Sequence, residues 1–261
     1  MTVVPAQPGA NPMPCELLQL DTPDAWPAEL QDLLDRHHEL FLNRETMPGR
    51  VGWREWETAI QAVATALGPF AITGWHCTRL TDSEVLQIVS HGMQLPDGAM
   101  LRRRIDALVQ AGLLACEVGA RLAQRNQSED SNRARRLWFC FFPPRLEGES
   151  GIGRFFRHWG GEALYNSHED DPETSPLLRA IGTPCIVEAD VPVASLAPGV
   201  RLAMKLVRRH LIAQGCQTEE QVEHADQCVW PLPADCIRRV MRHPEPAFLT
   251  LTGCTAWRVP L

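Results

Sequence analysis

The chain has 261 residues, of which 44% are hydrophobic and 22% are charged, and its formal net charge at pH 7 is −7. This composition provides enough apolar side chains for a packed core and excludes a disordered chain, and the negative charge argues against general binding to nucleic-acid backbones or anionic membranes. The opening residues have no basic segment followed by an apolar one, and no apolar run approaches the ~18–20 residues of a membrane span. We therefore expect a cytoplasmic protein with no membrane partner.

The nine cysteines are scattered along the chain, and none of them forms a C-x-x-C pair. An odd number without framework spacing is typical of free thiols in a reducing compartment. Tetrahedral metal sites usually draw on closely spaced ligand pairs, so we expect no metal.

The first 68 residues are predicted to lie outside the main domain. Prolines interrupt residues 1–20, which we interpret as a flexible tail. Residues 26–42 and 53–67 have apolar side chains at helical spacing. We therefore predict an N-terminal helical extension over residues 21–68, built from two helices.

The main domain, residues 69–261, is predicted to begin with a strand followed by a capped helix. Residues 70–77 read FAITGWHC, a short β-favouring run. The Thr81-Asp82-Ser83-Glu84 segment has the spacing of a capping box, and Gly92 stands where a C-terminal glycine cap belongs. The expected order is strand, turn and helix over residues 82–91.

The rest of the domain is predicted to mix helices with short strands. Helical patterns cover residues 100–124, with a break near Gly112, and residues 202–214. The segments that favour strands are 137–142, 184–189, 227–230, 248–251 and 256–259. Because these strands are not spaced like regular βαβ units, we predict an α+β class.

The first part of this order resembles ADP-ribosyltransferases of the poly-ADP-ribose polymerase and diphtheria-toxin type. The resemblance rests on His76-Cys77-Thr78 at the end of a strand, followed by the helix that ends at His91-Gly92. It implies that His76 holds a ribose hydroxyl of NAD, supported by Thr78, and that the backbone of Cys77 grips the nicotinamide amide. Cys77 stands where the family has glycine. The resemblance also implies a split, mostly antiparallel sheet with flanking helices.

A second block extends the resemblance to Tyr165, the only tyrosine in the chain. In the family, a tyrosine at the end of a helix stacks on nicotinamide. The nearby segment Trp159-Gly160-Gly161-Glu162 has two interpretations. Either it is a loop beside the nicotinamide, with Glu162 as an alternative catalytic acid, or it is a tight bend that lets Trp159 pack inward. Arg79 has two interpretations as well, because it suits either a phosphate of NAD or an acidic neighbour.

The third block departs from the family, which opens a later strand with a catalytic glutamate. Asp226 stands at the expected position here, and Gln227 and Glu223 are the alternatives. A carboxylate at this position would bond the 2′-hydroxyl of the nicotinamide ribose and offset the positive charge that develops when the bond to nicotinamide breaks. Purely structural interpretations also stay open: a satisfied strand-end histidine for His76, a core tyrosine for Tyr165 and a turn cap for Asp226.

The resemblance implies a mono-ADP-ribosyltransferase that uses NAD as substrate, releases nicotinamide and modifies a macromolecule. By family habit it also implies a toxin or defence protein. The acidic composition favours a protein acceptor over a nucleic acid, for which arginines within 102–104 and 133–136 would be the phosphate contacts. The alternatives are an NAD glycohydrolase and a non-catalytic module that binds NAD or ADP-ribose or serves as an interaction surface.

Overall fold

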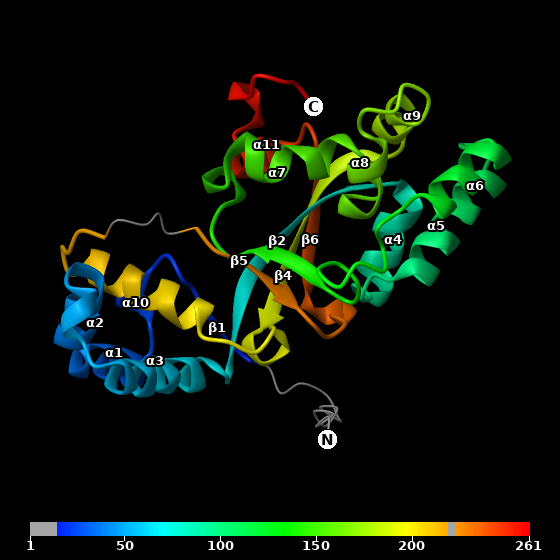
Figure 1. Cartoon of the computed structure of the whole chain (residues 1–261). Helices are drawn as coiled ribbons and strands as arrows, with labels where there is room; N and C mark the ends of the chain where they lie inside the picture. The colour runs from blue at the N-terminus through cyan, green and yellow to red at the C-terminus, as the bar shows by residue number, and fades with distance from the viewer. Residues whose placement is uncertain (1–14, 219–222) are drawn as a thin grey trace.

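The structure, a computed structural model, describes residues 15–218 and 223–261 and has an open, mostly antiparallel sheet at its centre (Figure 1). Its strands follow the order β5-β3-β2-β4-β6, and β1 pairs with β2 in parallel. The α+β class predicted from the sequence is confirmed. The strands are β1 (Glu16–Leu18), β2 (Phe70–Leu80), β3 (Leu137–Cys140), β4 (Thr183–Pro192), β5 (Ala225–Cys228) and β6 (Ile237–Arg242).

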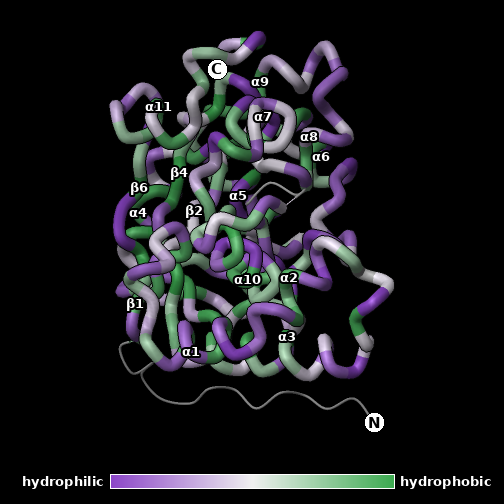
Figure 2. Tube along the Cα trace, turned by 90° about the vertical axis from the view of Figure 1, so that its left-hand side faces the viewer, coloured by the Kyte–Doolittle hydropathy of each residue, from purple (hydrophilic) through white to green (hydrophobic). Residues whose placement is uncertain are grey.

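The long strands β2 and β4 lie next to each other in the middle of this sheet. Their antiparallel ladder runs from the pair Ala71–Pro192 to the pair Leu80–Thr183. β4 is buried along most of its length, and Figure 2 draws part of it in the hydrophobic colour. The ladder between β2 and β3 is much shorter and consists of the pair Trp75–Cys140.

One face of the sheet packs against four helices, which Figure 1 shows grouped on one side of the molecule. They are α1 (Ala28–Arg36), α2 (His38–Thr46), α3 (Trp53–Leu67) and α10 (Arg201–Ala213). Their apolar stripes share a single hydrophobic core with the strands, in which Leu34, Ile60 and Leu206 meet Ile72 and Val187. The predicted helical extension thus shares its core with the sheet.

The other face is covered in part by α7 (Gly148–Arg157) and α11 (Pro246–Thr252). Phe156 and Phe248 from these helices pack edge to face over Cys77 and Ile186. A separate core surrounds Trp159, beyond the end of β2. The helices in this part of the chain are α4 (Asp82–His91), α5 (Gly98–Gln110), α6 (Cys116–Gln124), α8 (Glu162–His168) and α9 (Ser175–Ala180).

The helix after β2 begins and ends as its sequence predicts. The Thr81 hydroxyl accepts from the Glu84 backbone N–H, and the Glu84 carboxylate accepts from the Thr81 N–H, which completes the capping box. Gly92 ends the helix at φ 77° and ψ −168°, a conformation that is essentially restricted to glycine. The break near Gly112 is also present, because α5 ends at Gln110 and α6 begins at Cys116.

Several sequence predictions for other segments were wrong. Glu16–Leu18 is a strand rather than part of a tail, because its backbone pairs with β2. Residues 1–14 of the predicted tail lie outside the described part of the chain. The single helix predicted over residues 26–42 is interrupted at His37. Residues 248–251 belong to helix α11, and residues 256–259 form no strand. The strand predicted at 227–230 spans Ala225–Cys228.

Candidate functional site

His76 lies in β2 at the point where β2 and β3 separate. One residue beyond the pair Trp75–Cys140, the His76 ring reaches across to β3, and its Nδ1 lies 2.8 Å from the carbonyl oxygen of Trp138. The ring also packs against Phe139, with centroids 5.7 Å apart. The hydrogen bond between the His76 side chain and Trp138 therefore replaces backbone pairing between β2 and β3 at this point.

The hydrogen bond to Trp138 determines which nitrogen of His76 carries the proton. A carbonyl oxygen only accepts, so Nδ1 is the donor. Burial lowers the pKa of His76, and the positive charge of Arg104 lowers it further, so the ring is neutral near pH 7. Within residues 15–218 and 223–261, Nε2 has no hydrogen-bond partner. It presents a lone pair that is suited to accept from a hydroxyl group.

Asp226 lies in β5 on the same face of the sheet as His76, with one strand between them. It pairs in register with Phe139, and directly paired residues project to the same face. The residue is only 7% exposed. Its Oδ1 accepts from the Gln227 backbone N–H at 2.8 Å, and its Oδ2 lies 3.4 Å from Nε2 of His224, which is also buried.

Tyr165 lies in α8 and is buried. Its hydroxyl donates to Oε1 of Glu162 at 3.1 Å, and the other oxygen of Glu162 pairs with Arg133. Burial raises the pKa of Tyr165, and the Glu162 carboxylate raises it further, so the hydroxyl stays protonated. The guanidinium of Arg154 lies 4.0 Å from the ring centroid, and Phe155 meets the ring edge on. Stacking of another ring on the face that Arg154 covers requires Arg154 to move.

Trp159 is fully buried and precedes a tight bend. Gly160 and Gly161 both have positive φ, 86° and 56°, which turns the chain from α7 into α8. The indole Nε1 donates to both carboxylate oxygens of Glu84, at 3.1 and 3.2 Å, while Arg104 covers the ring at 4.6 Å. These contacts correspond to the packing interpretation of Trp159.

The residues that follow His76 in β2 have other surroundings. Cys77 projects to the opposite face, where a hydrogen bond with Cys140 and burial raise the pKa of its thiol. Thr78 is half-buried and pairs with β4. Arg79 donates to the carbonyl oxygens of Ile181, at 2.6 Å, and Phe156, at 3.0 Å. Arg79 therefore ties β2 to the C-terminal ends of α7 and α9 instead of pairing with an acidic neighbour.

The two alternatives to Asp226 lie on either side of it. Gln227 pairs with Trp138, so it projects away from the face that carries His76, and its side-chain oxygen accepts from Arg136. Glu223 precedes the strand, and its buried Oε2 has no hydrogen-bond partner in the part of the chain that the structure describes. Of the three candidates, Asp226 is the one that the register of β5 places on the His76 face.

The structure thus brings the predicted residues together in two groups. His76 and Asp226 share a sheet face, and Tyr165 is bonded to Glu162 on α8. Over the described ranges, no hydrogen bond or ion pair joins His76 to Tyr165 or Asp226. The sequence reasoning did not single out His224, although its spacing of two residues from Asp226 next to a predicted strand was a signal that both face the same way.

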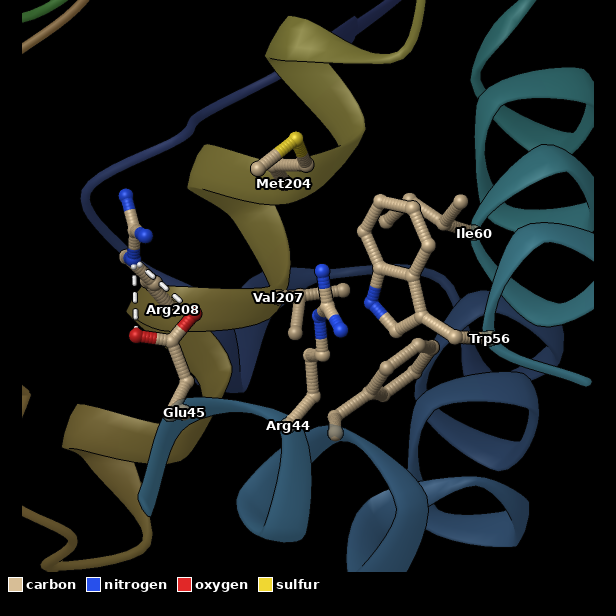
Figure 3. Close-up of a pocket in the computed structure, with 8 residues that line it drawn as sticks. Arg44, Glu45, Trp56, Ile60, Met204, Val207 and Arg208 are labelled. Carbon is tan, nitrogen blue, oxygen red and sulfur yellow. Dashed lines mark hydrogen bonds and ion pairs between the residues drawn. The ribbon is translucent and has the colours of Figure 1, made fainter. Parts of the chain in front are cut away.

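Two pockets lie away from these residues. The first, about 270 Å³, is lined by residues of α2, α3 and α10, including Trp56 and Val207 (Figure 3). At its edge both oxygens of Glu45 accept from Arg208 at 3.1 Å. The second, about 500 Å³, lies beside Trp75 and Glu188 on the face of the sheet opposite to His76.

Among the described residues, no group of three or more His, Cys, Asp or Glu side chains is placed to hold a metal ion, and no helix is long and apolar enough to cross a membrane. Comparison with protein-family models, with curated proteins and with solved structures found no match.

Proposed function

We propose that this chain is an NAD-dependent mono-ADP-ribosyltransferase with the split-sheet fold of that superfamily, which transfers ADP-ribose from NAD to a macromolecular acceptor and releases nicotinamide. The observation that carries the proposal is the position of His76. It stands where β2 and β3 part, with Nδ1 held by a backbone carbonyl and Nε2 left as an acceptor. This arrangement suits an imidazole that receives a hydrogen bond from a ribose hydroxyl.

Asp226 supplies the negative charge in this proposal. Breaking the bond between ribose and nicotinamide builds positive charge on the ribose, as in glycoside hydrolysis. A buried carboxylate stabilises such charge better than an exposed one, because little water screens it. Asp226 is buried, and its Oδ1 is fixed by the Gln227 N–H, so its orientation is set before substrate binds.

Tyr165 and Glu162 form the nicotinamide side of the proposed site. The Tyr165 ring offers a face for stacking when nicotinamide replaces the Arg154 guanidinium that now covers it. Glu162 holds the hydroxyl of Tyr165 and thereby fixes the ring. Arg133 balances the charge of Glu162, which suits a positioning role for this carboxylate better than a catalytic one.

The test is nicotinamide release from NAD by the purified protein and by three variants. Asp226→Asn should reduce release about 10²–10³-fold, as loss of one preorganised electrostatic group does. His76→Ala should reduce it about tenfold, the equivalent of one hydrogen bond of ~1.4 kcal/mol. His91→Ala is the matched control, because His91 is exposed and lies at the end of α4. Release that is equal in all four proteins would refute the assignment.

One observation favours a second candidate, a non-catalytic module that binds NAD or ADP-ribose. His224 contacts the Oδ2 of Asp226, the oxygen that a ribose hydroxyl would need. In that case NAD binds, binding weakens in His76→Ala, and no nicotinamide appears. Release without labelling of any protein in a lysate would instead identify an NAD glycohydrolase.

A further inference from the structure

The 500 Å³ pocket opposite His76 has a floor formed by one row of side chains across three strands. Trp75 in β2 pairs with Glu188 in β4, and Glu188 pairs with Arg239 in β6. Paired residues project to the same face, so indole, carboxylate and guanidinium lie side by side. The walls come from residues 17–21, from residues 141–143 and from α11. The pocket volume lies in the range of about 300–1,000 Å³ that small-molecule sites occupy.

Glu188 is the buried charge in this floor. The residue is 9% exposed, and its Oε2 accepts from Trp75 Nε1 at 3.3 Å and from Arg239 at 3.0 and 3.3 Å. Its Oε1 accepts no hydrogen bond from the residues described, yet Glu188 lines the pocket. Oε1 therefore has lone pairs available for an N–H donor that enters the pocket, and a hydrogen bond to an ionised carboxylate is stronger than one between neutral groups.

The charges around the pocket favour a cation as that donor. Arg238 and Arg239 contribute two positive charges to the lining, and Asp21 and Glu188 contribute two negative ones. Arg238 is in turn paired with Asp190, through Nε and Oδ1 at 2.6 Å. Arg239 is paired with Glu188, so each of the two guanidinium groups already has a carboxylate partner, and among the described residues the Asp21 carboxylate forms no ion pair.

The other residues that line the pocket favour a ligand whose cationic group is attached to a flat apolar ring. Trp75 is half-buried and presents its indole to the pocket, whose apolar wall includes Phe142, Pro143 and Leu251. Aromatic rings stack on indole, and a cation over an indole face is attracted by the negative π-cloud.

We propose that this pocket binds a small aromatic cation with an N–H donor, of the amidinium or protonated N-heterocycle class. The N–H group bonds Oε1 of Glu188, and the ring packs on Trp75. This site is separate from the proposed NAD site, because Trp75 and His76 project to opposite faces of β2.

The experiment is a titration of the full chain with benzamidine, followed by the Trp75 indole N–H signal in ¹H–¹⁵N NMR spectra, which Trp75→Phe identifies. Benzoate, of similar size and opposite charge, is the comparison ligand. We expect saturable shifts with benzamidine and none with benzoate. Glu188→Gln should weaken benzamidine binding at least tenfold, whereas Glu55→Gln, which alters an exposed glutamate, should leave it unchanged.

A second variant keeps the test decisive if Glu188→Gln fails to fold. Leu251→Trp fills the pocket from α11 without touching the charge, and it should also abolish the shifts. The proposal is overturned if benzamidine produces no saturable shift in the native protein. It is equally overturned if benzoate binds as well as benzamidine, or if Glu188→Gln or Leu251→Trp binds benzamidine as the native protein does. NAD takes no part in this titration, so its outcome is independent of the proposed transferase activity.

Discussion

Replacing Trp159 by alanine tests whether this residue is part of the core or part of a ligand site. The indole is fully buried among Leu101, Ile105, Leu122 and Leu164, and its Nε1 donates to Glu84. A buried tryptophan removes about 150–250 Å² from water, which at about 25 cal/mol per Å² stabilises the fold by ~4–6 kcal/mol. Trp→Ala substitutions in cores cost about 3–5 kcal/mol.

We expect Trp159→Ala to lower the free energy of unfolding by about 4 kcal/mol. The loss of the indole donor adds little, because Glu84 keeps its bonds to Arg104 and to the Thr81 N–H. Domains are stabilised by only about 5–15 kcal/mol, so the variant should unfold at a much lower urea concentration.

The assay is urea unfolding followed by far-ultraviolet circular dichroism, because the chain has eight tryptophans and fluorescence would mix their signals. Trp53→Ala is the matched control. Trp53 is 58% exposed and should cost less than about 1 kcal/mol, mainly through its contacts with Trp56 and Arg44. A loss below about 1.5 kcal/mol in Trp159→Ala, together with weaker NAD binding, would refute the packing role and favour a ligand contact.

Four further predictions concern local features. Burial and the nearby Arg179 lower the pKa of His158 to about 4. The free energy of unfolding should therefore be unaffected by His158 above pH 6.5 and should fall by up to ~1.4 kcal/mol per pH unit between pH 6.5 and 4, where the unfolded chain takes up a proton and the folded one does not. His158→Gln should flatten this part of a pH–stability curve. Thr81→Ala removes the side-chain half of the capping box and should cost about 1 kcal/mol in thermal or urea unfolding. Gly92→Ala should cost at least about 2 kcal/mol, because φ is 77° and a Cβ would lie 2.0 Å from a backbone oxygen. Since the pKa of His76 is lowered, NAD binding should stay constant from pH 8 to 6.5 and weaken only at a more acid pH.

Each of these predictions has an outcome that contradicts it. A pH–stability curve that is unchanged in His158→Gln would show that His158 stays neutral in both states or is charged in both. A free energy of unfolding for Thr81→Ala within about 0.3 kcal/mol of the native value, which is about the precision of such measurements, would show that the cap does not stabilise the protein. Gly92→Ala with native stability would mean that the backbone there is not held at positive φ. NAD binding that strengthens as the pH falls from 8 to 6 would mean that His76 binds as a cation.

The local parts of the fold could be predicted because their determinants lie within a few residues. The capping box at Thr81, the glycine stop at Gly92 and the break near Gly112 all depend on neighbouring side chains. β1 could not be predicted in the same way, because three residues form a strand only when a distant strand offers its edge, and Phe70–Ile72 provides it.

Helix α11 is marked in the sequence by residues at its two ends rather than by its central residues. Residues 248–251 read FLTL, which favours a strand when considered alone. Pro246 at the first helical turn and Gly253 in the left-handed conformation after the last turn mark a helix instead. The missed strand β6 (Ile237–Arg242) carries charged residues on an edge, which weakens its hydrophobic signal.

The sequence indicated the candidate residues but not the side chains that surround them. The sequence singled out His76 and Asp226 but not Phe139, which lies between them, because that neighbour depends on the register of three strands. The environment of Trp159 depends likewise on Glu84, which is 75 residues away in sequence. Long-range register and packing of this kind leave no mark on local sequence patterns.

The measurement that tests the central claim most directly is nicotinamide release from NAD by the native chain and by Asp226→Asn. Our account predicts release by the native chain and a loss of about 10²–10³-fold in the variant, with NAD binding by calorimetry retained in both. A native chain that neither releases nicotinamide nor binds NAD would contradict it.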